Sequence, residues 1–162
     1  MRLDRAWIEL RIPHHGSMCL LDEVIRWDTE RITCTSGSHR ALDNPLRARG
    51  QLGVACGIEY AAQSMALHGA LVAAAIAAPG LAAPANPQVA AASPPVAGFL
   101  ASVRGVQFYV SRLDDVQGDL ICDAVRVAGD RGTALYEFEL RCATQRLLRG
   151  RATVVLDANG KL

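Results

Sequence analysis

The feature that most constrains the fold of this chain is an alanine-rich apolar segment from Val54 to Ala78. It contains no proline, and apolar residues recur on nearly every side of the helix that it would form. Alanine has the highest helix propensity, and a helix that is apolar all round is a buried one. The segment therefore predicts one long helix enclosed by the rest of the chain. Gly57 and Gly69 would let that helix pack closely against a sheet.

Short segments of alternating polarity on both sides of this helix predict the sheet that encloses it. Two of them precede the helix, at 18–27 and 32–38. Four follow it, at 99–110, 120–127, 133–142 and 147–156. Period-two alternation with short links is typical of antiparallel strands. The order of two strands, one helix and four strands predicts an α+β fold, in which a six-stranded antiparallel sheet wraps around the central helix.

Length and composition fit one domain of this kind. The 162 residues are 51% hydrophobic and 20% charged, with a formal net charge of +1. A chain of this length is expected to form a single domain, residues 1–162. The nearly neutral charge argues against a nucleic-acid partner. The segment 79–97 holds five prolines and many alanines, and we expect it to be a surface loop without regular structure.

The positions of charged residues and cysteines indicate the cellular compartment of the protein. The first residues carry charges where a secretory signal would be apolar, and no segment is long and apolar enough to span a bilayer. The five cysteines are scattered, without the close Cys-x-x-Cys spacing of a metal or redox site. Reduced thiols are then the simplest interpretation. We expect a cytoplasmic protein with no bound metal and no membrane span.

Three short motifs occur in order along the first half of the chain. They are IPHHGSMCLLDEV at Ile12–Val24, DNPL at Asp43–Leu46, and GIEYAAQ at Gly57–Gln63. The third places a carboxylate four residues before a glutamine on the predicted helix. Together the motifs resemble those of the hotdog-fold 3-hydroxyacyl-[acyl carrier protein] dehydratases, and most of all the dehydratases encoded with aryl-polyene pigment pathways. The resemblance extends over nearly the whole chain.

The resemblance implies an activity and partners. The chain would be a 3-hydroxyacyl-[acyl carrier protein] dehydratase, or one subunit of such an enzyme, in fatty-acid or aryl-polyene biosynthesis. The acyl group would arrive on the phosphopantetheine arm of an acidic acyl carrier protein, so no separate cofactor is implied. Two hotdog sheets would join edge to edge, with a pantetheine tunnel at the subunit interface. Both a homodimer and a heterodimer with another hotdog subunit fit this resemblance.

Two groups of arginines are candidates for docking the acidic carrier protein. One consists of Arg40, Arg47 and Arg49, and the other of Arg141, Arg146, Arg149 and Arg151. Clustered positive charge attracts and orients an acidic partner. Arginines at alternate strand positions are equally typical of an ordinary solvated face.

The matched helix motif assigns the site residues. Glu59 is the position of the catalytic carboxylate, and burial on the helix would raise its pKa toward the range useful for acid–base catalysis. Gln63, one turn later on the same helix face, would orient it. The amides of Gly53, Val54 and Ala55 would polarise the thioester carbonyl, because N–H groups at a helix start lack intrahelical partners.

The catalytic histidine is the open point. Dehydratases of this type carry it in a Gly-His-Phe-Pro motif just before the helix, where this chain has RARGQL at Arg47–Leu52. Three alternatives follow. His14 or His15, ahead of the first strand, could reach the site; His39, at the end of the second strand, could do so instead; or a second hotdog subunit could supply the histidine. The aryl-polyene resemblance favours the last, since activity in those systems is thought to need two different hotdog proteins.

Two other functions remain compatible with the same residues. A hotdog acyl thioesterase also uses a helix carboxylate, and Glu59 alone could activate a water molecule for hydrolysis. A non-catalytic hotdog subunit of a heterodimeric dehydratase would need no histidine of its own. The mass of the product separates dehydration, which removes water, from hydrolysis, which removes the acyl group.

Overall fold

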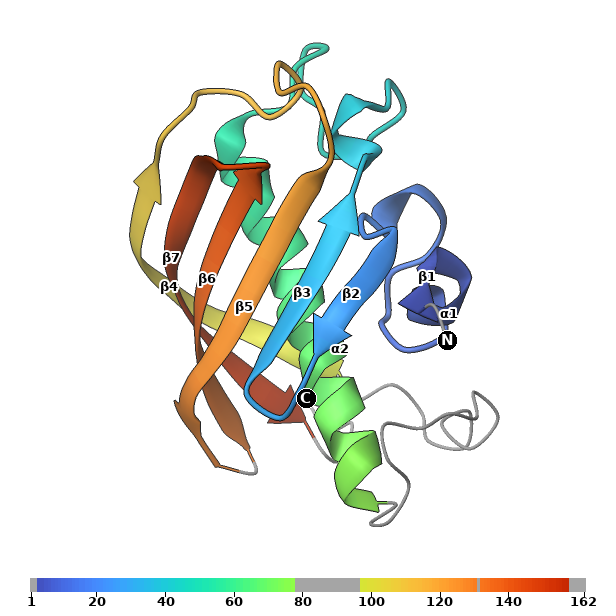
Figure 1. Cartoon of the computed structure of the whole chain (residues 1–162), viewed down its shortest axis with the longest axis vertical. Helices are drawn as coiled ribbons and strands as arrows, with labels where there is room; N and C mark the ends of the chain where they lie inside the picture. The colour runs from blue at the N-terminus through green and yellow to red at the C-terminus, as the bar shows by residue number, and fades with distance from the viewer. Residues whose placement is uncertain (1–2, 78–96, 131, 158–162) are drawn as a thin grey trace.

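The computed structural model describes residues 3–77, 97–130 and 132–157, and it has the expected α+β architecture (Figure 1). A seven-stranded antiparallel sheet lies against one long helix. The prediction of a hotdog fold is thereby confirmed. The expected strand count was six, and the additional strand is a two-residue edge strand, Leu3–Asp4, too short for sequence periodicity to register.

The strands follow the order β1-β2-β3-β5-β6-β7-β4 across the sheet. Their bounds are β1 Leu3–Asp4, β2 Glu23–Trp27, β3 Arg31–Ser36, β4 Ala97–Phe108, β5 Leu120–Gly129, β6 Thr133–Cys142 and β7 Gln145–Asp157. β4 is the first strand after the helix, yet it lies at the far edge of the sheet and pairs with β7. Within the described ranges its other edge has no partner strand.

The N-terminal region differs most from the expectation. A strand was predicted from residue 18, but β2 begins at Glu23, and Gly16–Met18 form a short 3-10 helix, η1. The reason is that Met18 and Leu20 bond through their backbone to the side chain of Gln63 rather than to a strand. A short helix that was not predicted, α1 at Arg5–Glu9, precedes η1. The predicted loop 79–97 lies outside the described residues, except that residue 97 begins β4.

The central helix agrees with its prediction. α2 runs from Gly57 to Ala77, and a 3-10 turn, η3, at Val54–Cys56 leads into it. A Cβ atom added at Gly57 would lie 2.3 Å from Leu148 Cδ2 and 2.8 Å from Leu140 Cδ2. Glycine is therefore what lets α2 approach the sheet this closely. No helix in the described part of the chain has the length and apolarity needed to cross a membrane.

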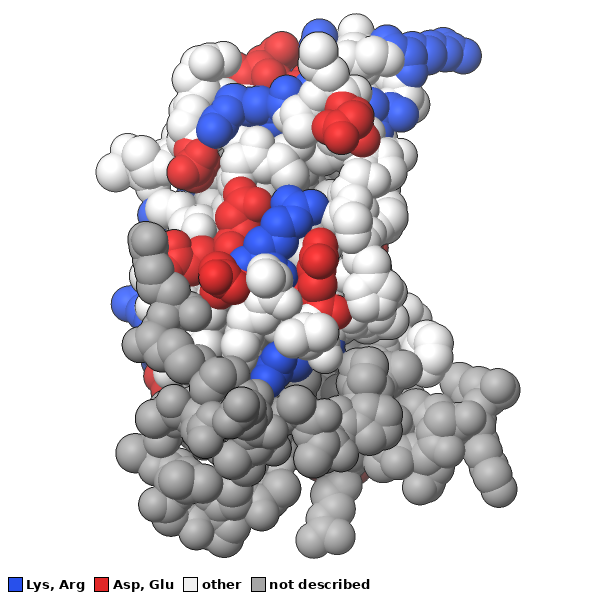
Figure 2. Space-filling view, turned by 90° about the vertical axis from the view of Figure 1, so that its right-hand side faces the viewer, with Lys and Arg blue, Asp and Glu red and all other residues white. Residues whose placement is uncertain are grey.

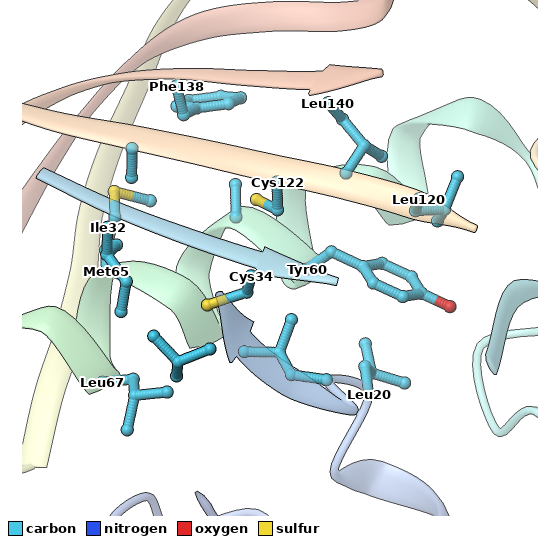
Figure 3. Packing of buried hydrophobic residues seen from close by; sticks show 14 of the residues in the cluster. Leu20, Ile32, Cys34, Tyr60, Met65, Leu67, Leu120, Cys122, Phe138 and Leu140 are labelled. Atoms are coloured by element: carbon cyan, nitrogen blue, oxygen red, sulfur yellow. The ribbon is translucent and has the colours of Figure 1, made fainter. Parts of the chain in front are cut away.

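The core lies between α2 and the sheet (Figure 3). Tyr60 and Met65 of α2 are buried there, as are Cys34 and Cys122, which are opposite each other on β3 and β5. Burial raises the pKa of Cys34 and raises that of Cys122 to about 12, so both remain protonated thiols at neutral pH. All five cysteines are free, and these two act as small apolar residues of the core.

Two histidines are buried in the same domain. His68 Nε2 donates to the carbonyl of Asp28 at 2.8 Å, so its Nδ1 accepts the hydroxyl of Tyr136, also at 2.8 Å. His39 Nε2 donates to the carbonyl of Val116 at 3.2 Å. Burial lowers the pKa of both rings, since desolvation disfavours the charged form. Both are therefore neutral in the folded protein at pH 7.

We expect the protein to lose stability as the pH falls below about 6.5, the ordinary histidine pKa in an unfolded chain. Below that pH the unfolded state binds protons that buried His39 and His68 do not, so the free energy of unfolding decreases. Each histidine contributes at most about 1.4 kcal/mol per pH unit. Urea unfolding at a series of pH values measures the slope. The variant His68→Gln should show a shallower slope; the same slope in both proteins would contradict this assignment.

Candidate active site

The start of the central helix is held by backbone pairing with the segment after β4. Val54 N donates to the carbonyl of Ser111 at 3.0 Å, and Leu113 N donates to the carbonyl of Leu52 at 2.8 Å. The Val54 amide is therefore occupied, and its predicted role as an oxyanion donor is corrected. This pairing joins residues far apart in the sequence, so helix position alone could not reveal it.

The neighbouring amides differ from that of Val54. Cys56 N donates to the carbonyl of Gly53 at 3.0 Å, whereas the Ala55 amide has no backbone acceptor within the described residues. Ala55 and Gly53 are both exposed, and a Cβ atom at Gly53 would meet nothing within 4 Å. Of the three predicted amides, those of Gly53 and Ala55 are exposed and have no backbone acceptor in the described residues, and that of Ala55 is the one inside the first turn, η3.

Glu59 lies one helical turn beyond Ala55, and its side chain is 32% exposed. Its Oε1 atom is 3.2 Å from His14 Nε2 and 3.1 Å from Gln63 Nε2. The structure thus brings together the predicted carboxylate, the predicted glutamine and one of the histidines considered from the sequence. The same oxygen of Glu59 accepts hydrogen bonds from both His14 and Gln63, and this fixes the carboxylate on the helix surface next to His14.

Gln63 ties this carboxylate to the segment that carries His14. It is fully buried, and its amide nitrogen donates to Glu59 and to the carbonyl of Met18 at 2.8 Å. Its oxygen accepts from Leu20 N at 2.9 Å. A single side chain therefore anchors both the segment around η1 and the carboxylate. A buried amide that makes all these hydrogen bonds is held rigidly. Gln63 therefore orients both the Glu59 carboxylate and the segment that carries His14.

The pKa of Glu59 lies below its usual range, contrary to the predicted rise. Burial does act to raise this pKa, but the hydrogen bonds from His14 and Gln63 and the charge of His14 together outweigh it. Glu59 is therefore ionised at neutral pH. The sequence prediction considered desolvation alone, because the partners that stabilise the carboxylate become known only from the tertiary structure.

The remaining histidines do not reach the carboxylate. His15 is exposed, and His39 is buried against Val116, so neither of these candidates is among the polar partners of Glu59. His14 has a half-buried side chain, and its Nδ1 atom is buried without a hydrogen-bond partner in the described part of the chain. Adjacent residues point in different directions, and this separates His14 from His15.

The sequence of this chain matches a known protein family. The family model of the ApeP-like proteins, described as ApeP dehydratase, matches residues 7–160. The chain belongs to the ApeP-like dehydratase family. No functionally curated protein gives a match to the sequence. The family assignment agrees with the dehydratase predicted from the motifs.

Solved structures similar to this ApeP-like dehydratase share its fold. The dehydratase heterocomplex ApeI:P from Xenorhabdus doucetiae matches with a TM-score of 0.72 and 18% identity, over 94% of this chain and 91% of that chain. The thioesterase HI1161 from Haemophilus influenzae matches with a TM-score of 0.53 and 11% identity, over 83% of this chain and 76% of that one. At these identities the similarity shows the fold alone.

The first arginine cluster of this ApeP-like dehydratase is largely engaged within the chain. Arg40 pairs with Asp119 at 2.8 Å, and Arg47 pairs with Asp114 at 3.1 Å. On the side of the molecule where α1 and β2 lie, acidic and basic side chains are intermingled (Figure 2). Internal pairing reduces the surplus charge that this cluster could offer an acidic partner.

The second cluster lies mostly in ion pairs as well. These pairs are Arg141 with Asp123, Arg146 with Glu139, and Arg151 with Glu137. Arg149 instead donates to the neutral side chain of Gln107 at 2.8 Å. A hollow of about 940 Å³ on this outer face of β4–β7 is lined by several of these side chains. Glu59 is not part of that lining, so the hollow is separate from the candidate site.

Proposed function

We propose that this ApeP-like protein is a 3-hydroxyacyl-[acyl carrier protein] dehydratase, a hydro-lyase, in which His14 and Glu59 perform the acid–base steps. The contact of 3.2 Å between His14 Nε2 and Glu59 Oε1 carries the proposal. It joins a histidine and a carboxylate at the start of the central helix, next to the exposed amide of Ala55. In this proposal His14 takes the role of the histidine that other dehydratases carry in the Gly-His-Phe-Pro motif, which this chain lacks.

The elimination needs one group that accepts a proton and one that gives a proton. The C2–H bond breaks and its electrons form the C2–C3 double bond, while the C3–O bond breaks and the hydroxyl takes a proton to leave as water. Because His14 and Glu59 share a hydrogen bond, a proton taken from C2 can pass within the pair and return to the departing hydroxyl. In this proposal the Ala55 amide, one helical turn before Glu59, donates to the thioester oxygen, on which negative charge develops.

The remaining components of the proposal concern the substrate and its delivery. The phosphopantetheine arm belongs to the acyl carrier protein that brings the substrate, and these residues need no metal or redox cofactor for the steps above. An acidic carrier protein would meet arginines such as Arg49 and Arg149, which have no carboxylate partner in the described residues. A cytoplasmic location, where the thiols stay reduced, completes the proposal.

Mass spectrometry of the products tests the activity. The chain is incubated with 3-hydroxyacyl-carrier protein, alone and with candidate hotdog partners. We expect the substrate to lose water. Release of the acyl group from the carrier would support the thioesterase alternative instead. Loss of water that needs a partner and survives replacement of both His14 and Glu59 would identify a non-catalytic subunit.

The open edge of β4 supports assembly with another hotdog subunit. The strand carries the exposed apolar side chains of Phe99, Leu100 and Phe108, which are 47%, 40% and 48% exposed. Unpaired strand edges with apolar side chains invite pairing with a second chain. The similar structure from Xenorhabdus doucetiae is described as a heterocomplex. We therefore propose that a second hotdog sheet, in a heterodimer or a homodimer, adds at β4.

Replacement of Phe108 by lysine should weaken this assembly by roughly tenfold or more, because it replaces an exposed apolar side chain of the β4 edge with a charge that assembly would have to desolvate. Light scattering with and without the candidate partner measures the effect. The matched control is Ile25→Lys, a change at an apolar residue of similar exposure on β2, 55% exposed, which should leave assembly unchanged. Equal effects of the two variants would contradict an interface at β4.

A further inference from the structure

A buried carboxylate that lies outside the His14–Glu59 pair organises the entrance of the central helix. The side chain of Asp114 is 6% exposed. Its Oδ1 atom accepts from Leu52 N and from Arg112 Nε, each at 3.1 Å. Its Oδ2 atom accepts from Arg112 Nη2 at 2.6 Å and from Arg47 Nη1 at 3.1 Å. Both oxygens are therefore satisfied by three residues, two of them from the segment before the helix and one from the segment after β4.

Arg47 extends this network into the loop before the helix. Its side chain is 11% exposed, and it also donates to the carbonyls of Ala41 and Gly50, both at 2.8 Å. The hydrogen bonds of Arg112, more than any other group, hold the pKa of Asp114 well below its usual range, so the carboxylate is charged. A buried ion pair adds little net stability, because desolvation offsets its attraction. The main effect of this ion pair is to fix the position of the backbone that leads into α2.

The backbone held in this way leads directly to the Ala55 amide. Asp114 bonds to Leu52 N, and two backbone bonds continue the contact, from Leu113 N to the Leu52 carbonyl and from Val54 N to the Ser111 carbonyl. The residue that follows Val54 is Ala55. The carboxylate and the backbone pairing together hold three consecutive residues immediately before this amide.

We propose that Asp114 is a positioning residue of the active site, which with Arg47 and Arg112 fixes the entrance of α2 so that the Ala55 amide is aimed at the thioester oxygen. This inference rests on the proposed dehydratase function. Oxyanion donors act only when they are held where the charge develops, and a displacement of about 1 Å can cost roughly 100-fold in rate. A purely structural role would lower stability without changing the turnover of the folded protein.

Asp114→Asn tests the assignment, because it keeps the size of the side chain and removes its charge. We expect kcat to fall by roughly 10- to 100-fold with KM changed by less than about threefold, since the donor acts mainly in the transition state. The matched control is Asp115→Asn. Its carboxylate is 64% exposed and contacts Arg112 at 3.4 Å, and this variant should keep the wild-type kcat.

Two further variants keep the test decisive if Asp114→Asn does not fold. Asp114→Glu retains the charge and should recover most of kcat. Arg112→Gln removes two of the four hydrogen bonds and leaves the pair with Arg47, so its kcat should fall by a smaller factor. Wild-type kcat in Arg112→Gln, and in Asp114→Asn if it folds, would overturn the proposal.

Amide hydrogen exchange separates this inference from the proposed activity. The hydrogen-bonded amides of Leu52 and Val54, which hold the segment before the Ala55 amide, should exchange faster in Asp114→Asn than in the wild type and in Asp115→Asn, while β6 exchanges equally in all three. If the wild type loses no water from any 3-hydroxyacyl substrate, with or without a partner, the dehydratase function fails; the exchange result then still decides whether Asp114 holds this segment. Unchanged exchange of the Leu52 and Val54 amides in a folded Asp114→Asn protein would overturn the positioning role.

Discussion

Glu59→Gln should abolish dehydration, with a loss of roughly 100-fold or more, while the protein remains folded. The amide has the size of the carboxylate and can still accept a hydrogen bond from His14 through its oxygen. It carries no negative charge and neither takes nor gives a proton in the relevant pH range. Initial rates of water loss, measured with the hotdog partner present, give the effect, and circular dichroism confirms the fold.

A matched control accompanies this variant. Glu30 is an exposed carboxylate in the turn between β2 and β3, and Glu30→Gln should retain full activity. Activity of Glu59→Gln within a factor of about three of the wild type would remove Glu59 from the chemistry. Because hydrogen bonds from His14 and Gln63 hold the pKa of Glu59 below its usual range, wild-type activity that depends on its ionised form should persist at mildly acidic pH.

His14→Asn should reduce dehydration by a similar factor of roughly 100 or more, because it removes the group that shares a proton with Glu59. The adjacent variant His15→Asn is the control, since His15 is exposed and lies outside the contacts of Glu59. It should behave as the wild type. Full activity of His14→Asn in the presence of the partner would show that the partner supplies the histidine.

His14→Asn has a second readout that does not depend on turnover. His14 lowers the pKa of Glu59 both by its hydrogen bond and by its charge, so its removal should raise that pKa. Carboxylate chemical shifts followed by NMR across a pH titration measure the change. An unchanged Glu59 titration in His14→Asn would contradict the 3.2 Å contact. His15→Asn should leave the titration as it is in the wild type.

The double variant tests whether the two residues act as a unit. If His14 and Glu59 pass one proton between them, either replacement breaks the same step, and the second adds little to the first. We expect Glu59→Gln with His14→Asn to lose about as much activity as either single variant. Losses that multiply would indicate that the two side chains act independently.

The fold and half of the site follow from local sequence patterns. Apolar residues all round the helix at 54–78 determine that it is buried, and period-two alternation determines the strands that cover it. The spacing of Glu59 and Gln63 places both on one helix face, since residues four apart are neighbours there, and the observed bond of 3.1 Å agrees. These features depend on neighbours in the sequence, so the sequence alone determined them.

The other half of the site was decided by contacts between distant segments. The choice of His14 over His15 and His39 depends on η1, whose path is held by bonds from Gln63 to residues more than forty positions away. The Val54 amide is occupied by Ser111, and the direction of the pKa shift of Glu59 is set by His14. Propensity and periodicity describe the backbone over one or two turns. Side-chain direction, amide occupancy and local electrostatics depend on which groups meet when the chain closes, and only the tertiary structure contains that information.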